Sequence, residues 1–228
     1  LLNWSYADWS ERTLKASEQT PRDKLAKDWH THIVSLNPTA KADEADARQA
    51  AELFTAYLRA CRNETFSMSA LPPGRFLMPG DLDGSPALTF APLPSHFHQP
   101  GNRDSLYAMM ERRFESYKSI VVKPFFRDHF IRLDRQIVLV DALSALNAGP
   151  ESLRDLETAL TDILATFRPG ANSWLSAILK RRVERILIAA TKADHLHRDS
   201  HDRLEAIVRR LTQQPIERAE FSGARVEA

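Results

Sequence analysis

Glycine is scarce in this sequence, with seven in 228 residues, less than half of the average usage of about 7%. Positions 1–73 contain none, and the dipeptide Gly-Lys does not occur. The phosphate-holding loop GxxxxGK[S/T], which depends on backbone N–H groups and a lysine, is therefore excluded from this stretch of chain. Because the sequence opens on Leu1 rather than methionine, we expect an internal fragment of a longer protein, so a motif missing here can lie outside it.

Three further shortages exclude other classes of protein. A single cysteine, Cys61, excludes a disulfide framework and a cysteine-rich zinc site, and it indicates a packing role in a reducing, cytoplasmic setting. The longest apolar runs, around 137–140 and 186–190, fall far short of the roughly 20 residues of a transmembrane helix. A net charge of +1 gives no overall field that would attract nucleic acid.

What is present is the composition of a folded domain, with 43% hydrophobic and 27% charged residues. Residues 1–66 are predicted to form a helical segment. Apolar residues recur at three- and four-residue steps in 21–36 and 43–62, which predicts two helices packed as a hairpin. Trp4 and Trp9 are expected to pack against it as core anchors.

Residues 67–104 form a proline- and glycine-rich loop segment in this interpretation. Only 88–93 (LTFAPL) has β-forming residues, and its proline suits an edge strand. A loop this long in a compact domain is typical of functional or disordered segments.

Residues 105–228 are predicted as the C-terminal part of a GTPase-like α/β domain. Apolar runs of strand length alternate with amphipathic helical patterns, which indicates a parallel sheet covered by helices on both faces. Ligands bind at the carboxyl ends of such strands. The expected elements are helix 105–122, strand 136–140, helix 151–168, strand 185–190 and helix 200–211.

Asp141 ends the first of these strands, after four aliphatic residues. A carboxylate delivered by a rigid strand resembles the Walker B pattern, in which it joins the magnesium shell. The alternative is an aspartate that only starts a turn, which is common.

The second strand is followed by Thr191-Lys-Ala-Asp194, which matches the [N/T]KxD guanine-recognition motif of GTPases. One carboxylate, here Asp194, can accept hydrogen bonds from both N1 and the 2-amino group of guanine. The stem of Lys192 can pack along the purine, and Thr191 can brace the loop. Adenine cannot satisfy this arrangement.

Three histidines follow the motif, at His195, His197 and His201. A metal site needs converging ligands, and the spacing favours structural roles or positions near a nucleotide instead. The sequence leaves their role open.

The chain resembles the YcjX-like family of bacterial P-loop GTP-binding proteins. The resemblance lies in 125–130 (FFRDHF), 133–147 (LDRQIVLVDALSALN) and 189–197 (AATKADHLH), and also in 71–77 and 88–93. It implies a P-loop NTPase-like, mostly parallel sheet, present here in part, with a helical insertion. It also implies a cytoplasmic protein linked with stress responses, with GTP or GDP as ligand and Mg²⁺ as cofactor.

Three departures limit what the resemblance implies. The phosphate loop lies upstream of this stretch in the family, and Asp141-Ala-Leu-Ser144 replaces DxxG, whose glycine N–H senses the γ-phosphate. The glutamine that follows DxxG in many GTPases has no counterpart, so the catalytic residue stays unassigned.

Two hypotheses follow. In the first, Thr191, Lys192 and Asp194 bind the guanine base, Asp141 binds magnesium through water, and the full-length protein hydrolyses GTP. In the second, the protein is a non-enzymatic nucleotide-binding switch or scaffold whose helices, such as 43–62, hold a protein partner. In either case this chain by itself is expected to be inactive.

Overall fold

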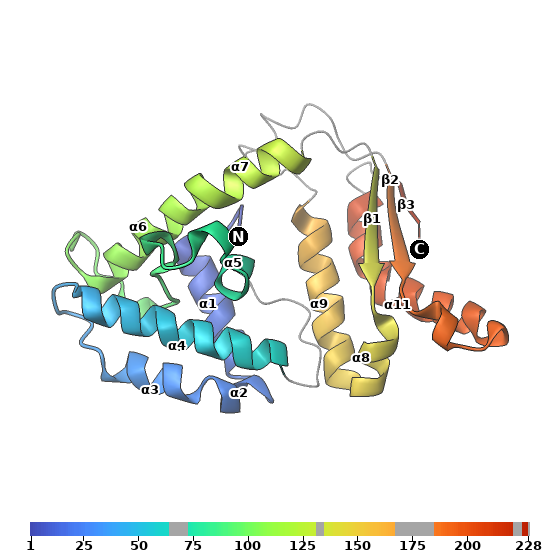
Figure 1. Ribbon diagram of the computed structural model, residues 1–228, viewed down its shortest axis with the longest axis horizontal. Coiled ribbons are helices and arrows are strands. Elements are labelled where there is room, and N and C mark those ends of the chain that lie inside the picture. The colour runs from blue at the N-terminus through green and yellow to red at the C-terminus, as the bar shows by residue number, and fades with distance from the viewer. Residues whose placement is uncertain (64–72, 131–134, 167–184, 221–224, 228) are drawn as a thin grey trace. The chain divides into compact units, whose positions relative to one another are not determined.

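The computed structural model describes residues 1–63, 73–130, 135–166, 185–220 and 225–227. The protein is a mostly helical α/β protein with a small parallel sheet (Figure 1). Its contacts divide it into two compact units. We call Leu1–Asn63 with Leu71–Pro124 the helical unit, and Glu64–Ala70 with Phe125–Ala228 the α/β unit.

The helical unit begins with a well-capped helix. The Ser5 hydroxyl accepts a hydrogen bond from the Asp8 backbone N–H, and the Asp8 carboxylate accepts one from the Ser5 N–H. This reciprocal pairing satisfies two backbone donors that a helix start leaves free. The helices that follow confirm the predicted hairpin, in which α3 contacts α4. The bounds are α1 Tyr6–Ser17, α2 Arg22–Leu25, α3 Lys27–Ser35 and α4 Glu44–Asn63.

Aromatic side chains make the core of this unit. Trp9 is fully buried and stacks on Phe114, with ring centroids 4.9 Å apart, and Trp29 stacks on Tyr57 at 5.3 Å. The predicted role of Trp9 as a core anchor is confirmed, and Cys61 is buried as expected. Large, rigid rings bury much apolar area for little lost side-chain freedom, so a few of them suffice to hold short helices together.

The proline- and glycine-rich segment folds into short helical turns instead of an edge strand. These turns are α5 Gly74–Leu77, η1 Gly80–Leu82, η2 Pro86–Leu88 and η3 Ser95–Phe97. The predicted strand at 88–93 is wrong: within it the Ala91 carbonyl accepts from the Tyr6 hydroxyl at 2.7 Å, and the Thr89 carbonyl accepts from Arg113 at 3.1 Å. Side chains thus take the place of a strand partner, and Phe90 is fully buried.

The predicted helix at 105–122 begins as α6 Leu106–Tyr117 and continues through the π-helical turn η4 Lys118–Val122, α7 Lys123–Phe125 and the π-helical turn η5 Phe126–Phe130. The Ser105 hydroxyl caps its start by accepting from the Ala108 N–H at 3.2 Å. Tyr107 and Phe114 turn into the aromatic core. By its contacts α6 therefore belongs with the helical unit, although the sequence grouped it with the α/β segment.

The α/β unit confirms the predicted strand–helix alternation. Strand β1 pairs with β2 in parallel over six residues, from Arg135 opposite Arg185 to Val140 opposite Ala190. The third strand, β3, which the sequence did not predict, pairs in parallel with β2. Figure 1 shows the three strands side by side in the order β1-β2-β3. The bounds are β1 Arg135–Val140, α8 Ala142–Ala148, α9 Pro150–Thr166, β2 Arg185–Ala190, η6 Ala193–His195, η7 Arg198–Ser200, α11 His201–Glu220 and β3 Arg225–Glu227.

Helices α8, α9 and α11 cover one face of this sheet. Aliphatic residues of both strands, including Val140 and Ile188, form a buried cluster with Leu160 and Val208 of the helices. The prediction that both faces are covered is not met by the residues that the structure describes. Residues of the opposite parity point away from the cluster, and Leu139 on that second face is 69% exposed.

Candidate functional site

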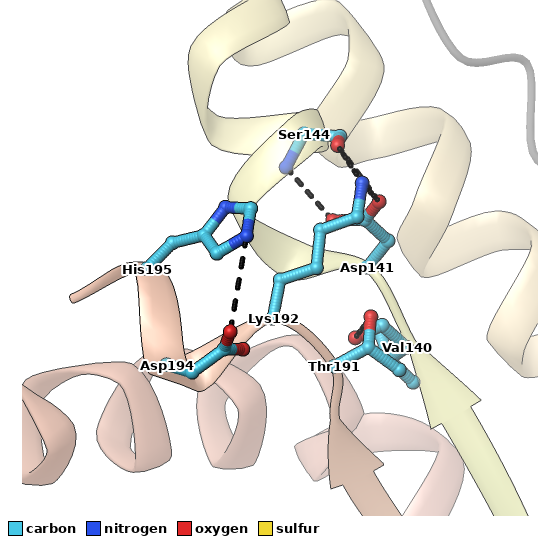
Figure 2. A network of polar contacts seen from close by, with 7 residues as sticks. All are labelled: Val140, Asp141, Ser144, Thr191, Lys192, Asp194 and His195. Atoms are coloured by element: carbon cyan, nitrogen blue, oxygen red, sulfur yellow. Dashed lines mark hydrogen bonds and ion pairs between the residues drawn. The ribbon is translucent and has the colours of Figure 1, made fainter.

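The candidate site lies at the carboxyl ends of β1 and β2. Because Val140 pairs with Ala190, Asp141 and Thr191 are the next residues of two neighbouring parallel strands. The Thr191 N–H donates to the Val140 carbonyl at 2.9 Å, and the Thr191 hydroxyl donates to the same oxygen at 3.4 Å (Figure 2). These bonds carry the ladder one residue beyond the strand, so the following loop leaves the sheet from a fixed point.

The loop after Thr191 has a strained and well-defined backbone. Lys192 has a φ of 59° and a ψ of 26°, the one left-handed conformation among the described residues other than glycine. For such a residue this conformation costs about 1–2 kcal/mol. The turn η6 then closes through the His195 N–H, which donates to the Lys192 carbonyl at 3.0 Å. Strain of this kind persists only where the surroundings impose it, and it is enriched at functional sites.

The side chain of Lys192 reaches back to the end of β1. Its ammonium group donates to Asp141 Oδ2 at 2.6 Å and to the Ser144 hydroxyl at 3.3 Å (Figure 2). The two charged side chains are 48% and 37% exposed, and a pair this open to water contributes about 1 kcal/mol or less. Its main consequence is therefore geometric, since it ties the loop of β2 to the end of β1.

Asp141 is also the N-cap of α8. Its Oδ1 accepts from the Ser144 N–H at 3.1 Å, and its Oδ2 accepts from the Ser144 hydroxyl at 2.7 Å. Burial alone would raise the pKa of Asp141, but the hydrogen bonds from Lys192 and Ser144 outweigh it and hold that pKa below its usual value. Asp141 is therefore an anion in a small network of three side chains.

Asp194 lies apart from this network. Its side chain is 84% exposed, and the nearest ring is that of His195, whose Nε2 is 3.9 Å from Asp194 Oδ2. Figure 2 shows the carboxylate on the His195 side of the turn, whereas Lys192 extends toward Asp141 and Ser144. The carboxylate oxygens of Asp194 are thus open to a ligand.

Two of the three histidines, His197 and His201, contact the backbone of this region. His201, the first residue of α11, lies with Nε2 3.0 Å from the Ala193 carbonyl; since a carbonyl only accepts, this nitrogen carries the proton. His197 accepts from the Asp199 N–H at 3.4 Å and starts η7. No group of three or more metal-binding side chains occurs among the residues that the structure describes.

The magnesium role predicted for Asp141 has limited support in this geometry. A carboxylate offers about four acceptor positions, and three of those of Asp141 are taken by Ser144 and Lys192. An ammonium group 2.6 Å away also offsets the charge that would attract a divalent cation. The described residues do not by themselves fit a bound magnesium ion.

Sequence reasoning named Ser144 and His201 but did not predict the contacts that they make in this site. Ser144 carries a weak signal, because an aspartate at the start of a helix takes up the backbone N–H three residues on. His201 carries none, because its contact with Ala193 depends on where α11 begins in space.

No helix in the described ranges is long and apolar enough to cross a membrane.

Comparisons with known proteins agree with the sequence resemblance. The chain matches the YcjX-like family, DUF463, over residues 1–228. The Ras-like GTPase YcjX of Escherichia coli is 34% identical over 230 residues, which cover 98% of this chain and 49% of the relative. The Ras-like GTPase YcjX of Shewanella oneidensis is 32% identical over 233 residues, which cover 100% of this chain and 48% of the relative. The chain spans about half the length of these curated relatives, and it belongs to the YcjX-like family.

Proposed function

We propose that this chain is the base-recognising part of a guanine-nucleotide-binding protein. The observation that carries the proposal is the turn after β2. There Thr191 is hydrogen-bonded to the last residue of β1, the backbone of Lys192 has a left-handed conformation and the carboxylate of Asp194 is exposed. The family relatives named Ras-like GTPase support the same class of ligand.

Each residue of the turn has a task in this proposal. Asp194 accepts hydrogen bonds from N1 and the 2-amino group of guanine, and both are strengthened by its charge. The stem of Lys192, half exposed, lies along the purine plane. Thr191 keeps the loop on the sheet. Adenine presents a lone pair at N1 and no 2-amino group, so it is rejected by the unpaired carboxylate.

The chemistry of the phosphates belongs to the full-length protein. The loop GxxxxGK[S/T] is not in this sequence. In the proposal, the groups that hold the phosphates therefore belong to a part of the full-length protein outside this chain. GTP hydrolysis with Mg²⁺ is the proposed reaction, by in-line attack of water on the γ-phosphate. The water-mediated magnesium role of Asp141, the cytoplasmic location and the link with stress responses stay predictions.

The test is an exchange of base specificity in the full-length protein. Asp194→Asn should weaken GDP binding about 100-fold, because two hydrogen bonds to a charged acceptor are disturbed. The same variant should bind xanthosine diphosphate better than the wild type does, since the new amide N–H can donate to the 2-oxo group of xanthine. Affinities measured by titration calorimetry decide the question.

A matched control lies five residues on. Asp199 is 88% exposed and sits in the next turn, so Asp199→Asn should leave both affinities within about twofold of the wild type. Unchanged GDP affinity in Asp194→Asn, or a wild-type preference for ADP, would rule out the proposed base recognition.

A second function, a non-hydrolysing switch or scaffold that holds a protein partner, is favoured by one contact. The Ser144 N–H stands where the glycine of DxxG would sense a γ-phosphate, and here it donates to Asp141 Oδ1 at 3.1 Å. That N–H is committed to capping α8. If the full-length protein binds GTP but releases no phosphate over many hours, the non-hydrolysing function is correct. Steady release of phosphate would establish that the protein hydrolyses GTP.

A further inference from the structure

Three side chains, Asp141, Ser144 and Lys192, join the ends of β1 and β2, and the base recognition proposed above uses only Lys192 of them. Asp141 Oδ2 accepts from the Lys192 ammonium at 2.6 Å and from the Ser144 hydroxyl, while Oδ1 accepts from the Ser144 N–H. Asp141 and Lys192 are 51 positions apart in the chain. Their ion pair is therefore a tertiary contact and not part of a local turn. It lies directly beside the loop that carries Asp194.

The backbone on either side of Lys192 is held independently. Thr191 is bonded to the Val140 carbonyl, and the Ala193 carbonyl is 3.0 Å from His201 Nε2. Lys192 is the residue between these two fixed points, and it takes up the left-handed conformation. The ion pair with Asp141 fixes the side chain of Lys192 as well. Both the backbone and the side chain of Lys192 are therefore held in place where the loop begins.

We propose that Asp141 is a positioning residue for base recognition, which anchors the Lys192 ammonium and thereby sets the stem of Lys192 and the turn that presents Asp194. The inference rests on the proposed function, because it concerns how the same site meets a guanine base. It differs from a metal-shell role, because Ser144 and Lys192 already take three of the acceptor positions of Asp141.

The chain offers a conservative variant at each end of the contact. Asp141→Asn keeps the Oδ1 acceptor that caps α8, because asparagine is as good an N-cap as aspartate, but it removes the charge that holds Lys192. Lys192→Met keeps an apolar stem for the purine and removes the ammonium. A melting curve for each full-length variant shows that its fold is retained.

The experiment measures GDP and inosine diphosphate affinities of the full-length protein, with excess Mg²⁺ and with a chelator. Asp141→Asn and Lys192→Met should each weaken GDP binding about three- to fivefold, because an ion pair this open to water contributes about 1 kcal/mol or less. The loss should be the same with and without Mg²⁺. Both substitutions should also reduce the preference for GDP over inosine diphosphate, which lacks the 2-amino group. A purely structural role of Asp141 would leave that preference unchanged.

The double variant completes the test. Asp141→Asn with Lys192→Met should be no weaker than either single variant, because both remove the same contact. Losses that multiply, or a loss seen only with Mg²⁺, would overturn the positioning role in favour of independent or metal-linked action. Unchanged GDP affinity in Asp141→Asn overturns this inference alone, whereas a wild type that binds no guanine nucleotide overturns the proposed function with it.

Discussion

The two units of the chain are stabilised in different ways. The helical unit closes around large aromatic residues such as Trp9, Trp29 and Phe114, all fully buried. The α/β unit has an aliphatic cluster on one face of its sheet, and on the second face Ile137 and Leu139 are 63% and 69% exposed. Among the described residues, the helical unit thus has an aromatic core, whereas the sheet of the α/β unit is packed on one face.

This difference separates stability from chemistry in the chain. In the helical unit the buried polar contacts, such as Tyr6 with the Ala91 carbonyl, satisfy backbone groups. In the α/β unit the polar side chains gather where β1 and β2 end, with Lys192 strained and Asp194 exposed. Strand ends present side chains without covering them, which is why ligands are found there.

The largest predicted effect tests the aromatic core. Trp9→Ala should lower the free energy of unfolding of the helical unit by about 3–5 kcal/mol, because it leaves a large cavity under Phe114. Denaturant titration followed by far-ultraviolet circular dichroism measures it. Trp4→Ala is the control, since Trp4 is only half-buried, and a loss as large as that of Trp9→Ala would contradict a core centred on Trp9.

The next effect compares the two faces of one strand. Ile188→Ala, which opens the aliphatic cluster, should cost about 2–4 kcal/mol. Leu187→Ala, on the second face and 43% exposed, should cost about 1 kcal/mol or less in the 228-residue chain. Equal losses in denaturant titration would mean that both faces are packed and would remove the contrast between the units.

Much of this fold could be predicted because periodicity reports burial directly. The spacing of Trp29 and Ile33 predicted a helix, and the unbroken apolar run 137–140 predicted a strand, but only one face of that strand is buried, since Ile137 and Leu139 are exposed. The segment 88–93 could not be predicted in this way. Its β-forming residues are buried by the aromatic core, and its carbonyls are taken by Tyr6 and Arg113 from distant helices.

The candidate site shows the same limit. A motif predicted Thr191, Lys192 and Asp194 as site residues, and the register of β1 with β2 explains why Asp141 lies beside the first two. The ion pair of Asp141 with Lys192 could not be predicted, because it depends on the left-handed turn at Lys192. A sequence pattern identifies groups that can bind, but not which of them bind each other.

A smaller effect tests how the strained turn is held. His201→Ala removes the bond to the Ala193 carbonyl and should weaken GDP binding by the full-length protein about fivefold, as expected for one lost hydrogen bond. His201→Gln should restore most of the affinity, because its amide N–H can donate to the same oxygen. If the glutamine variant binds as weakly as the alanine variant, the hydrogen bond is not what matters.

The smallest predicted effect concerns pH and belongs to the helical unit. Burial lowers the pKa of His30 below its usual value, and the nearby charge of Glu18 only partly opposes this. The unfolded chain therefore binds a proton at His30 more readily than the folded chain does. The contribution of neutral His30 to the free energy of unfolding is complete above about pH 6.5 and is lost as the pH falls through the lower, folded pKa.

His30→Gln keeps an N–H for the Ser17 hydroxyl, which lies 2.8 Å from His30 Nε2, but cannot titrate. The wild type should consequently lose more stability than His30→Gln between pH 7.5 and about pH 5.5. The described histidines of the α/β unit are all exposed, so a pH response located in that unit, or one equal in both proteins, would show that burial of His30 is not its source.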